Sequence, residues 1–397
     1  MFGSDPLFVN GVHWPEIWIV IVKVVVVFGV LLFSVMMMIW FERKIISDMQ
    51  ARIGPNRAGP YGLLQSLADG VKLFFKEDLV PERSDRFVFM LAPYLSILPA
   101  FLAFAIVPVG GVVSVDGHTF ELQIADPPVG ILFLLAMSSI AVYGIMLAGW
   151  SSGSKYPLLG SVRASAQMIS YEAALGLTIA IVVLLAGTLS TRGIVDAQSH
   201  TFFASWFLIR TGLVPFFIFL VAVVAETNRP PFDLVEADSE LVGGFNTEYS
   251  SIRFAIFYLA EFMNTITMSA IIVTLFLGGP DGPTPHIQVL DWVIPILWFS
   301  GKTLLFLFFY VWLRGALPRL RYDQLMDLGW KVLIPLSLIW LLIVAGALVG
   351  ADHWWWVIAL AGVLMLGGGL LTRALRVGKA RNEEASSSLI FETRGGR

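Results

Sequence analysis

Long apolar segments separated by short polar loops constrain this chain more than any other feature. A helix needs about 20 apolar residues to cross a bilayer. Only 14% of the 397 residues are charged, roughly half the share usual in soluble proteins. A soluble multidomain enzyme is therefore excluded, and we predict an all-α polytopic membrane protein. Its nine expected transmembrane spans lie at residues 17–41, 87–112, 128–149, 164–187, 204–225, 253–277, 291–313, 332–350 and 354–372.

Basic residues are distributed very unevenly between the two alternating sets of loops. Of the 26 Lys and Arg residues, 22 fall in one set, Arg192 alone falls in the other, and three lie within spans. Cytoplasmic loops of membrane proteins carry the excess of positive charge, so we expect the N-terminus outside and the C-terminus in the cytoplasm. The predicted domains are a helical membrane domain at 1–372 and a cytoplasmic tail at 373–397.

The first cytoplasmic segment, 42–86, is too polar to cross the membrane, yet part of it is periodic. Within 60–78, apolar residues recur at helical spacing opposite a polar stripe that contains Gln65, Asp69 and Lys72. This pattern predicts an amphipathic helix in the cytoplasmic interface, although a helix that only seals the edge of the protein would look the same. Just before it, residues 52–61 contain two Gly-Pro pairs and should form a compact loop.

The loop 226–252 is acidic although it lies on the basic side of the membrane. It carries six acidic residues against Arg229 alone, a balance of −5, and apolar residues are interleaved among them. Closely spaced carboxylates beside apolar surface repel each other and lose hydration, which favours proton exchange. A docking surface for a partner, or a solvated acidic turn, is the alternative. The acidic residues are Glu226, Asp233, Glu236, Asp238, Glu240 and Glu248.

Ionisable residues also occur inside the predicted spans, where charge is costly and suggests function. Glu172 and Glu261 each lie about eight residues into a span, roughly 12 Å deep at 1.5 Å per residue. Lys302 lies near the middle of the seventh span, and Glu226 closes the fifth. These groups suggest a buried line of proton-exchanging residues; internal pairing, such as Lys302 with Glu261, is the structural alternative.

The chain contains no cysteine. It therefore has no thiolate zinc site and no cysteine-ligated iron–sulfur cluster of its own. No glycine-rich dinucleotide motif is present, and none of the five histidines forms a pair with metal-ligand spacing. We expect no FMN, iron–sulfur cluster or metal in this chain, so partner proteins must carry any electrons.

Several blocks of the sequence closely resemble a known family. They cover most of residues 35–335 in order, and include GPYGLLQ, SAQMISYE, AETNRPPFDLVEADSELVGGFNTEY, AEFMN and PRLRYDQLMDLGWK. The resemblance is to the quinone-channel subunit of proton-pumping NADH:quinone oxidoreductase (respiratory complex I), a family with bacterial and mitochondrial members. Asp238 stands where the family usually has Glu, and the ninth span and tail extend beyond the mitochondrial form.

The resemblance implies a membrane-arm subunit that forms the entrance chamber for a quinone, ubiquinone or menaquinone, and links it to proton translocation. The quinone would be guided by Arg43, Arg52, Asn56, Gln65, Asp69 and Phe245. The proton relay would comprise Glu172, Glu226, Glu236, Asp238, Glu240, Glu261 and Lys302. Expected partners are the peripheral-arm subunits that build the quinone site, other membrane-arm subunits and the lipid bilayer, but no nucleic acid.

The resemblance also implies a multi-pass protein of the bacterial plasma membrane that acts only as part of an enzyme complex, with no complete active site in this chain. Two other functions fit buried Glu and Lys residues. One is an ion-coupled secondary transporter that works alone. The other is the related membrane subunit of an energy-converting hydrogenase, which needs no quinone.

Overall fold

Membrane-length helices make up most of the structure. The computed structural model describes residues 14–115, 118–199, 204–233, 242–283 and 292–349, and within them seven helices are long and apolar enough to cross a membrane. Six are α2 (Trp14–Met49), α4 (Arg86–Phe104), α5 (Gly130–Ser151), α6 (Lys155–Ala186), α11 (Ser251–Phe276) and α12 (Val293–Ala316). The seventh joins α13 (Tyr322–Leu328), the π-helical turn η3 (Gly329–Leu333) and α14 (Ile334–Val349). The predicted helical membrane fold is confirmed.

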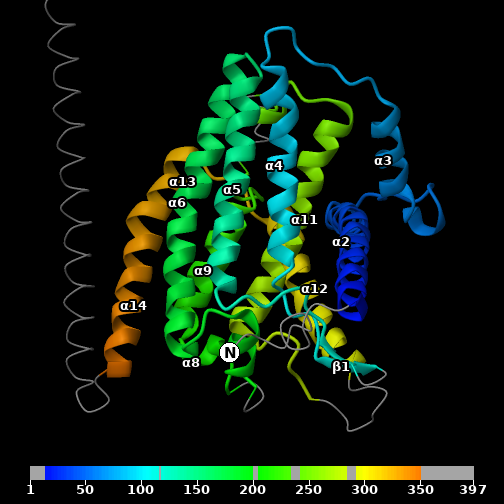
Figure 1. Cartoon of the computed structure of the whole chain (residues 1–397). Coiled ribbons are helices and arrows are strands. Elements are labelled where there is room, and N and C mark those ends of the chain that lie inside the picture. Colours follow the sequence, from blue (N-terminus) through cyan, green and yellow to red (C-terminus); the bar gives the residue numbers. More distant parts are fainter. Residues whose placement is uncertain (1–13, 116–117, 200–203, 234–241, 284–291, 350–397) are drawn as a thin grey trace, which may run out of the picture. The chain divides into compact units, whose positions relative to one another are not determined.

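The chain divides into two compact units, residues 1–334 and residues 335–397. In the first unit, α4 packs against α5 and α11, and α6 packs against α5 and α9 (Leu213–Glu226) (Figure 1). We call the end where α2 finishes and α4 begins the basic end, since it carries the predicted cytoplasmic loops. The ninth predicted span, 354–372, and the predicted tail, 373–397, lie outside the described residues.

At the opposite end of the first unit, the chain forms a short β-hairpin and two short helices. Strands β1 (Val112–Val115) and β2 (His118–Glu121) pair antiparallel. The second predicted span, 87–112, is therefore too long, because α4 ends at Phe104 and the next residues lead into the hairpin. The two short helices are α7 (Thr191–Asp196) and α8 (Phe207–Arg210).

The fifth predicted span, 204–225, is interrupted. Gly212, with φ +79°, separates α8 from α9, and the 14 residues of α9 rise about 21 Å, less than the roughly 30 Å of a bilayer core. The buried side chain of Gln198 stabilises the interruption: Oε1 accepts a bond from the Phe207 amide (3.1 Å), and Nε2 donates to the Thr274 carbonyl (3.0 Å). The prediction of one continuous helix here is wrong.

The predicted interfacial helix is present as α3 (Gln65–Phe75), next to the basic end of α2 (Figure 1). Ser66 is buried and its hydroxyl donates to the Met36 carbonyl of α2 (3.0 Å). The apolar residues predicted to face lipid are exposed on α3, among them Leu67, Val71 and Phe74. The apolar stripe of α3 therefore faces away from the rest of the chain. The loop before α3 is also held to α2, since Trp40 Nε1 donates to the Tyr61 carbonyl (3.1 Å).

Small residues let α5, α6 and the loop after α9 approach closely. A Cβ atom added to Gly160 of α6 would lie 2.7 Å from the Gly244 Cα and 3.0 Å from the Phe245 amide nitrogen. Gly244 and Phe245 belong to the turn η2 (Gly244–Asn246). By contrast, a Cβ atom at Gly176 of the same helix would meet nothing within 4 Å.

We expect Gly160→Ala to lower the free energy of unfolding by about 1–3 kcal/mol, because backbone atoms of η2 must move to admit the methyl group. Gly176→Ala is the matched control and should be neutral or slightly stabilising, since alanine favours helix. Unfolding of each variant in detergent, followed by tryptophan fluorescence, measures the difference. Equal stability of the two variants would contradict the close packing described for Gly160.

Candidate functional site

A buried and a half-buried carboxylate bind adjacent serines of α5. Glu226, the last residue of α9, accepts a hydrogen bond from Ser138 Oγ, and Glu172 of α6 accepts one from Ser139 Oγ. The sequence predicted a functional role for both Glu residues but gave no signal for the two serines, because no residue pattern indicates which helix faces which.

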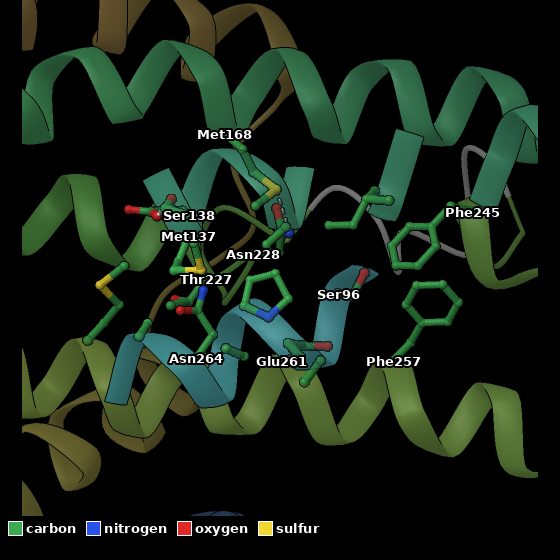
Figure 2. Close-up of a pocket in the computed structure, with 18 of the residues that line it drawn as sticks. Ser96, Met137, Ser138, Met168, Thr227, Asn228, Phe245, Phe257, Glu261 and Asn264 are labelled. Carbon is green, nitrogen blue, oxygen red and sulfur yellow. Dashed lines mark hydrogen bonds between the residues drawn. The ribbon is translucent and has the colours of Figure 1, made fainter. Parts of the chain in front are cut away.

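Glu226 also lines an internal cavity, which we call the carboxylate cavity (Figure 2). Its polar side chains come from α4, α5, α11 and the loop after α9, and apolar residues such as Met137 and Met168 complete the wall. About 70 Å³ of it can hold water, which is room for about five molecules at 10–15 Å³ each. The polar lining consists of Ser96, Ser138, Glu226, Thr227, Asn228, Asp233, Asn246, Glu261 and Asn264.

Aromatic rings close one end of the carboxylate cavity. The rings of Phe245 and Phe257 meet edge to face with centroids 5.2 Å apart (Figure 2). Next to them, Tyr249 stacks on Phe89 at 4.0 Å and its hydroxyl donates to the Phe89 carbonyl (3.1 Å). Burial raises the pKa of Tyr249 to about 12, so the hydroxyl keeps its proton at neutral pH. Phe245, predicted to contact quinone, therefore lies in this cavity.

A second, larger cavity lies at the basic end between α2, α11 and α12. We call it the arginine chamber; its volume is about 360 Å³, in the range of small-molecule sites. It contains two of the predicted quinone-guiding residues, Arg43 and Arg52. The chamber is lined by Glu42, Arg43, Ile46, Gln50, Arg52, Tyr258, Arg314 and Gly315.

Two further predicted quinone-guiding residues connect to this chamber through Arg43. Arg43 Nη1 donates to Asp69 Oδ2 of α3 (2.6 Å), and Gln65 Nε2 donates to Asp69 Oδ1 (3.2 Å). Arg52 Nε donates to Gln50 Oε1 (2.7 Å). Asn56 is exposed in the loop between α2 and α3. Four of the six predicted residues thus lie at or beside the chamber, while Phe245 does not.

Buried charges lie between the two cavities. Arg229, in the loop after α9, hydrogen-bonds through Nη1 to Glu42 Oε2 (3.4 Å), and its Nε lies 3.2 Å from Glu261 Oε1. Glu42 is also paired with Arg314 of α12. Glu42 and Arg229 are 5% and 6% exposed. The sequence did not single out Glu42, Arg229 or Arg314 as site residues, since the partners of Glu42 are 187 or more positions away.

The other predicted relay residues lie elsewhere. Lys302 is at the opposite end of the unit, where its Nζ donates to the carbonyls of Leu277 (2.8 Å), Gly279 (3.0 Å) and Asp281 (2.8 Å). The suggested pairing of Lys302 with Glu261 is therefore absent from the described structure. Glu236, Asp238 and Glu240 lie outside the described residues. Among the described residues, no group of three or more His, Asp or Glu side chains could hold a metal ion.

These features define a polytopic helical membrane protein with buried carboxylates beside internal space. Comparison with known proteins identifies its family: the profile described as NADH dehydrogenase matches residues 22–345. The chain belongs to this NADH dehydrogenase family, which confirms the resemblance. It also confirms the prediction of a multi-pass bacterial membrane protein.

Curated relatives agree with the family assignment. Proteins named as the H subunit of NADH-quinone oxidoreductase are 55% identical in Frankia alni over 87% of this chain and 74% of the relative, and 54% identical in Frankia casuarinae over 89% and 75%. The protein of that name in Streptomyces avermitilis is 51% identical over 87% of this chain and 74% of its own length.

We expect the buried and the exposed ion pairs to differ strongly in stability. Glu42→Ala leaves Arg229 and Arg314 without this carboxylate and should lower the free energy of unfolding by about 3–5 kcal/mol. Asp69→Ala breaks a pair that is 44% and 29% exposed and should lower it by less than about 1 kcal/mol. Unfolding in detergent compares the two variants. Equally small losses would show that the buried charges contribute little to stability.

Proposed function

We propose that this chain is the membrane-arm subunit of a proton-translocating NADH:quinone oxidoreductase that forms the quinone entrance chamber and the adjoining part of the proton path. The flavin and iron–sulfur centres would belong to other subunits of the complex. The partners proposed are the peripheral-arm subunits that complete the quinone site, the neighbouring membrane-arm subunits and the lipid bilayer. The basic end would face the cytoplasm.

The observation that carries this proposal is a pair of cavities, the arginine chamber at the basic end and the carboxylate cavity inside the helical bundle. The arginine chamber has the volume of a small-molecule site, whereas the carboxylate cavity has room only for a few waters. A quinone head group therefore suits the chamber, and a proton path suits the cavity. Glu42 lines the first space, Glu261 lines the second, and Arg229 contacts both residues.

In the chamber, Arg43 and Arg52 would guide the polar head group, because guanidinium donors can bind carbonyl oxygens. Asp69 and Gln65 would hold Arg43 in place. The exposed apolar stripe of α3 would lie in the membrane interface, so that a lipid-soluble quinone can enter beside it. Asn56 would contact the quinone in the exposed loop, whereas Phe245 lies beside the carboxylate cavity and suits the proton path rather than the quinone.

In the proton path, Glu172, Glu226 and Glu261 would exchange protons through the serine hydroxyls and water in the carboxylate cavity. Glu236, Asp238 and Glu240 would extend this path into the acidic loop. Lys302 would act at the opposite end, where it holds the carbonyls that follow α11. Because a carboxylate in a poorly hydrated site can be stable in either protonation state, these side chains suit proton exchange.

The test of the relay is the replacement of Glu172 or Glu226 by Gln. Gln preserves size and hydrogen bonding but cannot carry a proton. We expect an intact complex in which quinone-linked turnover and proton pumping both fall about tenfold or more. Complex content, NADH:quinone turnover and proton uptake into vesicles are measured together, with the exposed Glu77→Gln as the control. Wild-type turnover and pumping in both Gln variants would refute the relay.

The test of the quinone portal is the replacement of Arg52 or Asp69 by Leu. Each change should raise the KM for quinone severalfold, while NADH oxidation by a water-soluble electron acceptor persists. Arg57→Leu, in the same exposed loop, is the control and should leave both activities unchanged. Equal loss of the two activities in the Arg52 and Asp69 variants would instead indicate failed assembly and contradict the guiding role.

A further inference from the structure

Arg229 is bound less completely than a buried cation normally is. It is 6% exposed, and its guanidinium carbon lies 4.0 Å from the centre of the Phe262 ring, so it is largely shielded from bulk water. Within the described residues, its Nε and Nη2 atoms make no hydrogen bond, although Nε is within ion-pair distance of Glu261. Its bond to Glu42 is long at 3.4 Å. A guanidinium held between two carboxylates, with donors left unused, can shift its contact from one to the other.

The carboxylate of Glu42 is shared by two cations. Arg229 binds Oε2, and Arg314, which lines the arginine chamber, binds Oε1. The side chain of Arg314 is 35% exposed, whereas that of Arg229 is 7% exposed. Of the two cations, only Arg314 can therefore turn toward a molecule in the chamber. A stronger ion pair between Arg229 and Glu42 therefore weakens the ion pair between Arg314 and Glu42.

We propose that Arg229 is a positioning residue that transmits the charge of Glu261 to Arg314 through competition for Glu42. This inference deepens the proposed function and rests on it. When Glu261 takes up a proton, its attraction for Arg229 falls and Arg229 moves toward Glu42. Arg314 then loses part of its partner and becomes available as a hydrogen-bond donor to the quinone head group in the chamber.

The same linkage works in reverse, because coupling between two sites is reciprocal. A molecule in the chamber that draws Arg314 away leaves Glu42 to Arg229. Arg229 then interacts less with Glu261, and the proton affinity of Glu261 rises. Binding in the larger cavity would thus change proton occupancy in the smaller one without any large movement of the helices.

The experiment is a double-mutant cycle between Glu261→Gln and Arg314→Lys, performed with the whole complex in two backgrounds. The measured quantity is kcat/KM for a water-soluble short-chain quinone. With Arg229 present, we expect the change in kcat/KM of the double variant to differ about fivefold or more from the product of the changes in the two single variants. In an Arg229→Lys background, the single effects should multiply within about twofold. Arginine contacts Glu42 and Glu261 through two different nitrogen atoms, whereas the single ammonium nitrogen of lysine cannot reproduce this geometry.

A second background, Arg253→Lys, controls for the replacement of an arginine that is largely shielded from water. Arg253 pairs with Asp78 at 3.0 Å and lies 5.6 Å from the Phe89 ring centre, but it lines neither cavity. The coupling between Glu261 and Arg314 should survive Arg253→Lys. Three results would overturn the inference. The coupling could persist in Arg229→Lys, it could disappear equally in Arg253→Lys, or it could be absent when Arg229 is present.

Failure of this inference can be told apart from failure of the proposed function. If the Glu172→Gln and Glu226→Gln variants pump normally, the relay is refuted whatever the cycle shows. If those variants stop pumping but Glu261 and Arg314 act independently, the relay stands and the role of Arg229 is refuted. If Arg229→Lys reduces complex content, kcat/KM is expressed per assembled complex, so the cycle still decides.

Discussion

The basic end of this protein depends on one cation buried between two carboxylates. Arg229 is the sole basic residue of the acidic loop between α9 and α11, and it contacts Glu42 of α2 and Glu261 of α11. A buried charge is tolerated only when opposite charges surround it, so the three residues must be placed together. Through Arg314, the same interaction extends to α12. Three helices that are distant in sequence are thereby tied to one loop.

The two ends of the first unit are built on different principles. The basic end uses ion pairs and contains the arginine chamber, so its polar groups have partners that can gain or lose charge. At the opposite end, the ion pair of Arg192 with Asp196 (3.2 Å) is partly exposed, and several buried polar side chains bind neutral or backbone partners. Gln123 donates to the carbonyls of Ile106 and Ala125, Gln198 ties α8 to α11, and Lys302 binds three carbonyls. Such bonds do not change with proton uptake by an acid.

Local sequence signals predicted the elements well but not their interruptions. The apolar periodicity of residues 60–78 correctly placed α3, because one face of that helix remains exposed in the structure. The fifth span was expected to be continuous because apolar content alone does not detect a break. Gly212 and the buried Gln198 make that break stable, and the second of these acts through residues on other elements.

The sequence by itself determined the membrane class, the helical fold and the family, and it predicted a role for Glu172, Glu226 and Glu261. These conclusions follow from apolar length, from the high cost of charge in lipid and from long motifs, all of which are local properties of the chain. Only the tertiary structure decided which groups meet: Glu226 with Ser138, Arg229 with Glu42, and Lys302 with carbonyls far from Glu261. Pairing depends on helix rotation and packing, and residues as distant as Ser138 and Glu226, 88 positions apart, leave no local pattern that encodes it.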